Sequence, residues 1–175
     1  THRLKTGLNL ALNEARLGND FQKDFLLTPL SLRKVVTDVV NQQKTAFIQR
    51  NLFPSVEIDD TLQVISDAKW LAFIIEQLLT NALKYSHPQG TITLKANRNT
   101  QTIELTIADS GIGIPKSDLP RVKQAFFTGE NGRKFGEATG MGLYLVQQVA
   151  EELGIEFLID STVNVGTSVT LKIPI

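Results

Sequence analysis

The chain has 175 residues, and its 18 lysines and arginines equal its 18 aspartates and glutamates, so its net charge is zero. A neutral chain has no general attraction for phosphate backbones, which argues against a nucleic-acid-binding module. It has no cysteine, and this excludes disulfides, thiolate metal sites and a cysteine nucleophile. With 42% hydrophobic and 21% charged residues, the composition is typical of a single globular domain.

The first 24 residues carry a narrow apolar seam, because Leu4, Leu8, Ala11 and Ala15 recur at spacings of three and four. Such a seam is typical of a coiled-coil helix, and Gly18 marks its expected end. No apolar run reaches the roughly 18 residues of a membrane span. Since the chain does not begin with methionine, we expect it to be a piece of a longer protein.

Short strands and a helix follow this segment. Residues 25–30 are predicted to form a strand, and Ser31 is a suitable N-cap for a helix over 32–50. Two further short strands are expected over 53–58 and 62–66. A proline in the first of them predicts an edge or irregular position in a sheet.

The strongest predicted helix covers residues 68–85, with Asp67 as its N-cap. It is apolar over most of its circumference, which predicts that it is buried against a sheet. Residues 91–96 and 102–108 then alternate apolar and polar side chains and are separated by a short polar turn. This pattern predicts a β-hairpin.

The last third of the chain is expected to contain a helix over 140–153 and a hairpin formed by 156–160 and 168–173. Between them and the preceding hairpin, residues 109–139 show little periodicity, and loops this long in a compact domain are usually functional. Together the elements predict an α+β fold, a two-layer α/β sandwich whose mostly antiparallel sheet has helices on one face.

Polar residues form a stripe on the otherwise apolar helix over 68–85. Gln77, Asn81 and Lys84 fall within about 100° of one another at roughly 100° per residue. A carboxamide oxygen is a suitable ligand for Mg²⁺, and a neighbouring lysine suits a phosphate group. The alternative is an ordinary solvated stripe.

A glycine-containing turn, DSGIGI, follows the strand predicted to end at residue 108. Asp109 can accept a hydrogen bond from an exocyclic amine, while Gly111 and Gly113 let a ligand approach the backbone. Ile112 and Ile114 offer apolar surface to a flat ring. The turn lacks the spacing of a Walker phosphate loop, and the alternative is a plain glycine turn.

Two more clusters contain small residues. The first, Thr139-Gly140-Met141-Gly142-Leu143, opens the predicted helix over 140–153, and backbone N–H groups at a helix N-terminus can bind an anion. The alternative is a flexible N-terminal cap. The second, Gly166-Thr167-Ser168, is expected to be a hairpin turn.

Taken in order, the four clusters resemble the N, G1, G2 and G3 boxes of the GHKL superfamily. This superfamily includes sensor histidine kinases, type II topoisomerases, mismatch-repair ATPases and a class of heat-shock chaperones. The chain is most similar to the histidine-kinase ATP-binding domain, over residues 25–175, through QLLTNALKYS, DSGIGI, the pair Phe126 and Phe127, and TGMGLYLV. The resemblance implies a Bergerat-type sandwich that holds ATP and Mg²⁺ between the buried helix and a lid.

The resemblance also implies roles for individual residues. Asn81 matches the Mg²⁺-binding asparagine, and Asp109 matches the carboxylate that recognises the adenine amine. The catalytic residues it implies are Gln77, Asn81 and Lys84. The nucleotide-binding residues it implies are Asn81, Lys84, Tyr85, Asp109, Gly111, Gly113, Ile114, Phe127, Arg133, Lys134, Thr139, Gly140, Met141, Gly142, Leu143 and Thr167.

Residue 77 distinguishes a kinase from a hydrolase. In hydrolytic members of the superfamily, a glutamate four residues before the Mg²⁺-binding asparagine activates water, whereas this chain has Gln77. Glutamine cannot act as a general base, and Glu76 lies about 100° away around the helix. The alternatives that stay open are a GHKL ATPase, an anti-sigma-type serine kinase and a degenerate nucleotide-binding module.

The resemblance implies a transfer of the γ-phosphate of ATP to a histidine that this chain lacks. Neither His2 nor His87 has the acidic neighbour of the family's acceptor histidine. Residues 1–24 are expected to be the second helix of a dimerisation and phosphoacceptor hairpin, followed by a linker. The implied parent is a homodimeric bacterial membrane sensor with a cytoplasmic kinase domain and a response regulator as its partner. FFTGENGR, residues 126–133, is most similar to kinases that serve antimicrobial-peptide transporters.

Overall fold

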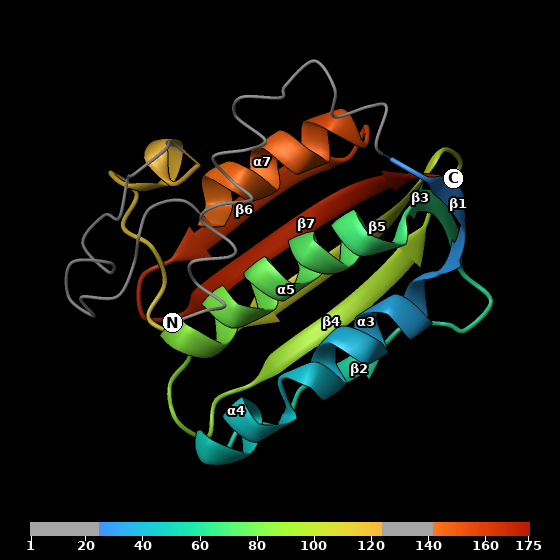
Figure 1. Cartoon of the computed structure of the whole chain (residues 1–175). Helices are drawn as coiled ribbons and strands as arrows, with labels where there is room; N and C mark the ends of the chain where they lie inside the picture. The colour runs from blue at the N-terminus through green and yellow to red at the C-terminus, as the bar shows by residue number, and fades with distance from the viewer. Residues whose placement is uncertain (1–24, 124–141) are drawn as a thin grey trace, which may run out of the picture.

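A five-stranded sheet with helices on one face forms the body of the protein (Figure 1). The structure, a computed structural model, describes residues 25–123 and 142–175. The strand order is β2–β4–β5–β7–β6, and only β2 and β4 run parallel. The strands are β2 (Ser55–Glu57), β4 (Ile92–Arg98), β5 (Thr102–Asp109), β6 (Glu156–Thr162) and β7 (Gly166–Pro174).

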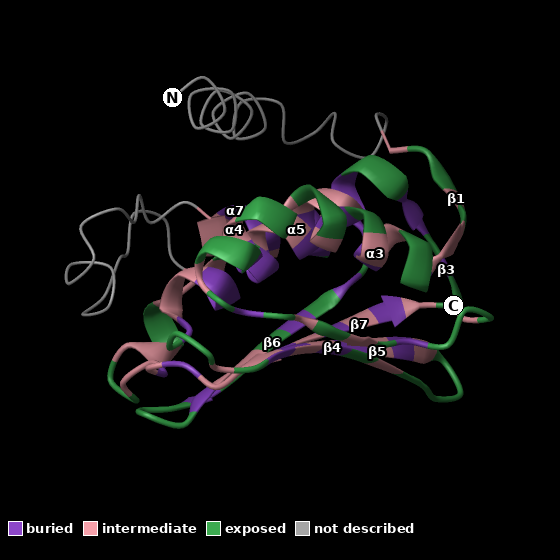
Figure 2. Ribbon diagram, turned by 90° about the horizontal axis from the view of Figure 1, so that it is seen from below, coloured by how far each residue is buried: buried purple, intermediate pink, exposed green. Residues whose placement is uncertain are grey.

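Three helices make up the layer over this sheet: α3 (Leu32–Gln42), α5 (Ala68–Tyr85) and α7 (Gly142–Glu152). Residues coloured as buried lie in both layers, in the helices and in the strands of the sheet (Figure 2), and most of them belong to one core cluster. This arrangement confirms the predicted α+β sandwich with a mostly antiparallel sheet. The short α4 (Lys44–Gln49) and the 3₁₀ helix η1 (Leu119–Arg121) complete the helical elements of the described residues.

The central helix α5 is apolar on most sides because it lies between the sheet and its two neighbouring helices. It contacts α3, α7 and β5. Its buried side chains are Trp70, Leu71, Ile74, Ile75, Leu78, Leu79, Ala82 and Leu83. Its predicted N-cap is confirmed, because Oδ1 of Asp67 accepts the N–H of Trp70 at 3.0 Å.

A separate two-stranded ribbon consists of β1 (Leu27–Ser31) and β3 (Gln63–Asp67), paired antiparallel. Both strands were expected from the sequence, but their pairing was not. Asp67 joins the ribbon to α5, because its Oδ2 accepts the N–H of Leu26 at 2.8 Å while its Oδ1 caps the helix. The predicted cap at Ser31 is also present, with its hydroxyl accepting the N–H of Lys34 at 3.3 Å.

The helix predicted over 32–50 is interrupted, which corrects the sequence-based expectation. α3 ends at Gln42, Gln43 has a non-helical ψ of 10°, and α4 starts at Lys44. The residues from Asn41 to Thr45 are all polar, so no apolar side chain is available for burial at the break itself. Beyond the break, Phe47 of α4 is buried in the main core.

The segment Gly166-Thr167-Ser168 is the beginning of strand β7 rather than the predicted hairpin turn. Its three residues pair with Thr162, Ser161 and Asp160 of β6, and the turn itself covers 163–165. The strand therefore starts earlier than the alternation of side chains suggested. This pairing places the backbone of Thr167 opposite Asp109 at the end of β5.

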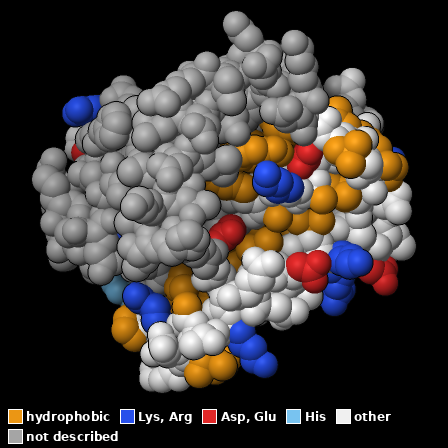
Figure 3. Space-filling view, viewed as in Figure 1, with side chains coloured by type: hydrophobic (Ala, Val, Ile, Leu, Met, Phe, Trp, Pro, Cys, Tyr) orange, Lys and Arg blue, Asp and Glu red, His pale blue; other side chains and the backbone are white. Residues whose placement is uncertain are grey.

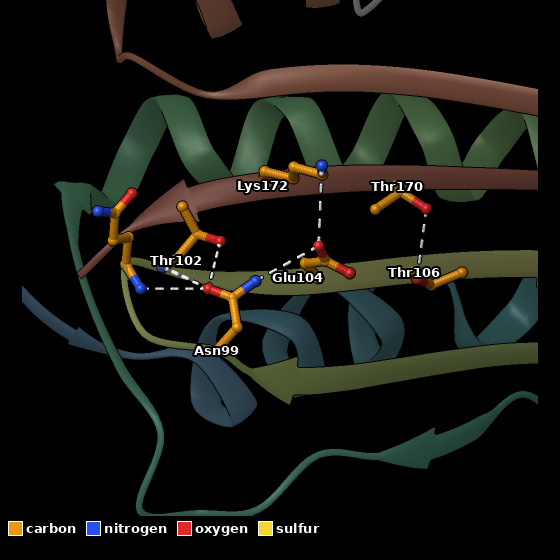
Figure 4. A network of polar contacts seen from close by, with 7 residues as sticks. Asn99, Thr102, Glu104, Thr106, Thr170 and Lys172 are labelled. Atoms are coloured by element: carbon orange, nitrogen blue, oxygen red, sulfur yellow. Dashed lines mark hydrogen bonds and ion pairs between the residues drawn. The ribbon is translucent and has the colours of Figure 1, made fainter.

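The outer face of the sheet carries polar side chains. At the turn between β4 and β5, Oδ1 of Asn99 accepts hydrogen bonds from the N–H of Gln101 and from the N–H and hydroxyl of Thr102 (Figure 4). On neighbouring strands, Lys172 Nζ lies 3.9 Å from Glu104 Oε1. These contacts lie at the end of β5 opposite to Asp109.

The helix-covered face shows hydrophobic side chains among scattered charges, and its coloured part has no large basic patch (Figure 3). Within the described residues, no helix has both the length and the hydropathy needed to cross a bilayer.

Replacing a fully buried leucine of α5 should destabilise the protein strongly. For Leu79→Ala we expect the free energy of unfolding to fall by about 2–5 kcal/mol, because loss of this fully buried side chain leaves a cavity in the main core. The matched control is Leu158→Ala, since Leu158 is 41% exposed on β6. It should lose about 0.5 kcal/mol in the same urea titration, and equal losses for the two variants would contradict the described packing.

Candidate functional site

Asp109 ends β5 next to the C-terminal end of α5, and its carboxylate is half-buried. Oδ1 accepts the N–H of Gly111 at 2.8 Å and the N–H of Thr167 at 3.3 Å. Within residues 25–123 and 142–175, Oδ2 accepts no hydrogen bond. The backbone therefore fixes one oxygen and leaves the other available to a donor on a ligand.

Burial raises the pKa of Asp109 above its ordinary value of 3.8, while the two N–H donors and the positive field of His87 oppose this rise. A carboxylate held in this way has its negative charge partly desolvated, which strengthens its attraction for a hydrogen-bond donor that arrives with a ligand.

The chain after Asp109 crosses the last turn of α5 in close contact. The N–H of Ile112 donates to the carbonyl oxygen of Tyr85 at 3.1 Å. Gly111 is pressed against the same carbonyl, so that a Cβ at residue 111 would overlap its oxygen. A glycine is therefore required here by close approach of two backbones. The crossing joins the predicted turn 109–114 directly to the helix that carries the polar stripe.

The second half of the turn is held by the β6–β7 hairpin. Gly113 has a φ of +74°, and a Cβ there would overlap the carbonyl of Thr162. The N–H of Ile114 donates to the hydroxyl of Ser161 at 2.8 Å. The same hydroxyl donates to the carbonyl of Gly166 at 2.9 Å and lies 2.8 Å from Oγ1 of Thr167.

These contacts bring together five of the residues predicted for the nucleotide: Asp109, Gly111, Gly113, Ile114 and Thr167. Ser161 was missed by the sequence analysis, although its hydroxyl links Ile114 in the turn to Gly166 and Thr167 at the start of β7. The available signal was its position, because it follows the inward-facing Phe157 and Ile159 at even spacing on β6. A polar residue in an inward-facing row needs hydrogen-bond partners.

The polar stripe on α5 lies beside this cluster. Gln77, Asn81 and Lys84 are all half-buried, whereas the residues between them are mostly buried. Tyr85 ends the helix next to the turn, and Nζ of Lys84 lies 5.6 Å from the centroid of its ring. At about 1.5 Å per residue, the helix carries the stripe roughly 12 Å from Tyr85 back to Gln77, with Asn81 midway.

The opposite end of the stripe meets α7. A Cβ on Gly142 would lie 3.3 Å from Oε1 of Gln77, so the Gln77 amide faces the first residue of that helix. Leu143, the next predicted residue, is half-buried and packs against the main core. Two motifs that are 65 positions apart in sequence are thus side by side.

Six of the predicted nucleotide-binding residues lie outside the described residues: Phe127, Arg133, Lys134, Thr139, Gly140 and Met141. The same holds for Phe126 and for the predicted helix within residues 1–24.

The described segment that follows the turn is tied to the edge strand β6 through Lys123. Its ammonium lies 4.3 Å from the ring centroid of Phe157 and donates to the Phe157 carbonyl oxygen. Burial lowers the pKa of Lys123, although Glu151 and Glu156 partly oppose this effect. The ammonium group of Lys123 therefore anchors residues 115–123 to β6.

The described residues contain no group of three or more His, Cys, Asp or Glu side chains that could enclose a metal ion. Asn81, a half-buried amide on α5, fits an ion that arrives with other ligands of its own.

A half-buried carboxylate at a strand end, a glycine turn packed against a helix and a polar stripe on that helix form a candidate small-molecule site, at the C-terminal end of the central helix of an α/β sandwich. Residues 66–175 match the family described as histidine kinase-, DNA gyrase B- and HSP90-like ATPase. The chain belongs to this family.

Several curated relatives carry the name of sensor kinases. The chain is 38% identical to the sensor histidine kinase YxdK of Bacillus subtilis over 168 residues, which cover 95% of this chain and 51% of that protein. It is 35% identical to the sensor protein kinase GraS of Staphylococcus aureus, with 99% and 49% covered. The chain therefore spans about half the length of the curated relatives it matches.

Solved structures share the fold. The Mycobacterial sensor histidine kinase MprB superposes with a TM-score of 0.74 at 25% identity, covering 84% of this chain and 97% of the other. The Acinetobacter baumannii histidine kinase AdeS has a TM-score of 0.78 at 22% identity, with 98% and 79% covered.

Asp109→Asn tests the carboxylate without changing its shape. The amide oxygen can keep the hydrogen bonds from Gly111 and Thr167, which places an NH₂ group where Oδ2 was. The new NH₂ group and the exocyclic amine of adenine are both hydrogen-bond donors, so no bond can form between them. ATP affinity should therefore fall about 10- to 100-fold, as for the loss of a hydrogen bond to a charged group. Calorimetric titration with ATP measures this, with the exposed Asp38→Asn on α3 as the control.

The same variant should be more stable than the wild type without nucleotide. Because burial raises the pKa of Asp109, the folded state binds its proton more tightly than the unfolded state, and the wild type loses stability as pH rises through that pKa. The neutral amide avoids this loss, so Asp109→Asn should melt higher at pH 7, with the difference shrinking towards pH 4. A lower melting temperature at pH 7 together with unchanged ATP affinity would refute the role of the carboxylate.

Proposed function

We propose that this chain is the ATP-binding catalytic part of a sensor histidine kinase, which transfers the γ-phosphate of Mg-ATP to a histidine outside the chain. The observation that carries the proposal is the junction between Asp109, Gly111 and the Tyr85 carbonyl, which builds an amine-recognising carboxylate beside the polar stripe of α5. Family membership and the sensor-kinase names of the curated relatives support it.

The order of the residues along α5 supports one direction for the bound nucleotide. The adenine amine would donate to Oδ2 of Asp109, next to Tyr85 at the end of the helix. The phosphates would then extend along the stripe past Lys84 and Asn81, towards Gln77 and the N-terminus of α7. A lysine and a helix N-terminus both favour a phosphate, through charge and through free N–H groups.

Mg²⁺ fits this site as an ion brought by ATP. It usually keeps several waters and binds few protein groups when phosphates supply the other ligands, and the amide oxygen of Asn81 would be such a group. When bound, the ion neutralises charge that develops on the transferred phosphoryl group. Lys84, one turn along the helix, would add a second positive charge.

Phosphotransfer is favoured over hydrolysis by the side chain at position 77. The amide of Gln77 cannot accept a proton near neutral pH, and it faces Gly142 at the start of α7. A general base must lie within hydrogen-bond reach of the attacking water. We therefore assign Gln77 to positioning near the phosphates and not to activation of water.

The acceptor would be a histidine on the dimerisation hairpin of the parent protein, formed by two copies of that protein. His87 lies exposed in the turn after α5, where its carbonyl accepts the N–H of Gly90 at 2.9 Å.

We propose a response regulator as the next phosphate acceptor and a bacterial membrane sensor as the parent, with this domain in the cytoplasm. Relatives about twice as long, named as sensors, support this assignment.

A transporter that handles antimicrobial peptides is a further proposed partner of the parent. The support is the sequence FFTGENGR at 126–133, which resembles that group of kinases. A nucleic-acid partner is not proposed, since the chain is neutral overall.

The test is incubation with γ-labelled ATP, Mg²⁺ and a purified hairpin that bears the acceptor histidine. We expect label on the hairpin that is lost in acid and kept in alkali, as for phosphohistidine. Asn81→Ala should reduce labelling at least about tenfold and remove its dependence on Mg²⁺. Asn97→Ala, an exposed asparagine on β4, is the control and should label normally.

Steady release of inorganic phosphate by the chain alone, unchanged by the hairpin, would contradict the kinase assignment in favour of a hydrolase. Acid-stable label on a serine would favour a serine kinase instead.

A further inference from the structure

We propose that Arg50 is a positioning residue for the nucleotide site, because it holds the C-terminal end of α5 on which that site is built. Arg50 follows α4 and, in the sequence, precedes all four clusters that resemble family motifs. The inference rests on the proposed ATP site and adds a residue to it from outside those motifs.

The backbone around Arg50 is fixed by a helix-ending motif. The N–H of Leu52 donates to the Phe47 carbonyl at 3.0 Å, and the N–H of Asn51 donates to the Ile48 carbonyl at 3.1 Å. Asn51 has a φ of +55°. These bonds define a Schellman motif, and its usual apolar contact is supplied by Phe47 and Leu52, both buried. The position of Arg50 is thus set by the core.

The side chain of Arg50 reaches the end of α5. Its guanidinium donates to the carbonyl oxygen of Ser86 at 2.8 Å. Ser86 is the C-cap of α5, and both its N–H and its hydroxyl donate to the Ala82 carbonyl. A positive charge at a helix C-terminus also interacts favourably with the helix dipole. Figure 1 shows α4 at the same end of the molecule as the end of α5.

The carbonyls of two consecutive residues at the C-terminal end of α5 therefore accept hydrogen bonds from different parts of the chain. The Tyr85 carbonyl accepts Ile112 from the turn after Asp109, and the Ser86 carbonyl accepts Arg50. The first contact sets how the turn lies on the helix, and the second sets where the helix end lies relative to α4. Without Arg50, the end of α5 would lose its contact with the residue after α4, and we expect a shift of Lys84 and Tyr85 relative to Asp109.

Arg50 also costs folding free energy that a purely structural contact would not require. Its Nε is buried and has no hydrogen-bond partner within the described residues. A buried donor without a partner opposes folding, so an apolar side chain at this position would be the simpler way to fill the space. The charge and the directional bond to Ser86 are what an apolar side chain would lack.

The test compares Arg50→Ala, Arg50→Lys and Arg50→Met with Arg98→Ala. Arg98 is exposed and ends β4, where it pairs with Ile103 at the opposite end of the sheet from Asp109. We expect Arg50→Ala and Arg50→Met to bind Mg-ATP about tenfold more weakly by calorimetry. Arg50→Lys should recover part of this loss, and Arg98→Ala should match the wild type.

Chemical rescue separates positioning from mere stability. Methylguanidinium at low millimolar concentration should restore much of the ATP affinity of Arg50→Ala, but not that of Arg50→Met, whose side chain fills the space. If Arg50→Ala does not fold, the Lys and Met variants carry the comparison.

Wild-type ATP affinity in folded Arg50→Met, with only a lower melting temperature, would overturn the positioning role and leave the proposed function intact. Failure of the wild type and of Arg98→Ala to bind ATP would instead overturn the proposed function, and this inference with it.

Discussion

The contact between residues 110–114 and the last turn of α5 is the constraint on which the candidate site depends. Gly111 can lie against the Tyr85 carbonyl only because it has no side chain, and Ile112 adds a hydrogen bond to the same oxygen. This crossing sets the distance between a carboxylate on the sheet and a polar stripe on a helix. The β6–β7 hairpin, through Ser161 and Thr167, holds the turn from the other side.

The same junction shows how function opposes stability in this fold. Asp109 is half-buried and its pKa is raised by burial, so its negative charge costs folding free energy at neutral pH. The backbone N–H groups of Gly111 and Thr167 reduce that cost but leave one oxygen for a ligand. A partly desolvated carboxylate with a raised pKa is typical of a binding site. Arg50, with its buried Nε, is a second example at the other side of α5.

Much of the fold could be predicted from local signals. The N-caps Ser31 and Asp67, the apolar helix α5 and the alternating strands β4 and β5 each follow from residue type and period, and all are present. The break at Gln43 was missed because no glycine or proline marks it in the sequence. The pairing of β1 with β3 was missed because pairing between distant strands leaves little trace in a single sequence.

The site was only partly predictable for a similar reason. Asp109, Gly111 and Gly113 stand out because a carboxylate and glycines follow a strand, whereas Ser161 and Arg50 act through contacts with residues distant in sequence.

The most direct test of the central claim is the affinity of the chain for ATP compared with inosine triphosphate, in which a carbonyl replaces the adenine amine. If Asp109 recognises that amine, the chain should bind ATP about 10- to 100-fold more tightly than inosine triphosphate at the same Mg²⁺ concentration. Equal affinities for the two nucleotides would contradict the assignment.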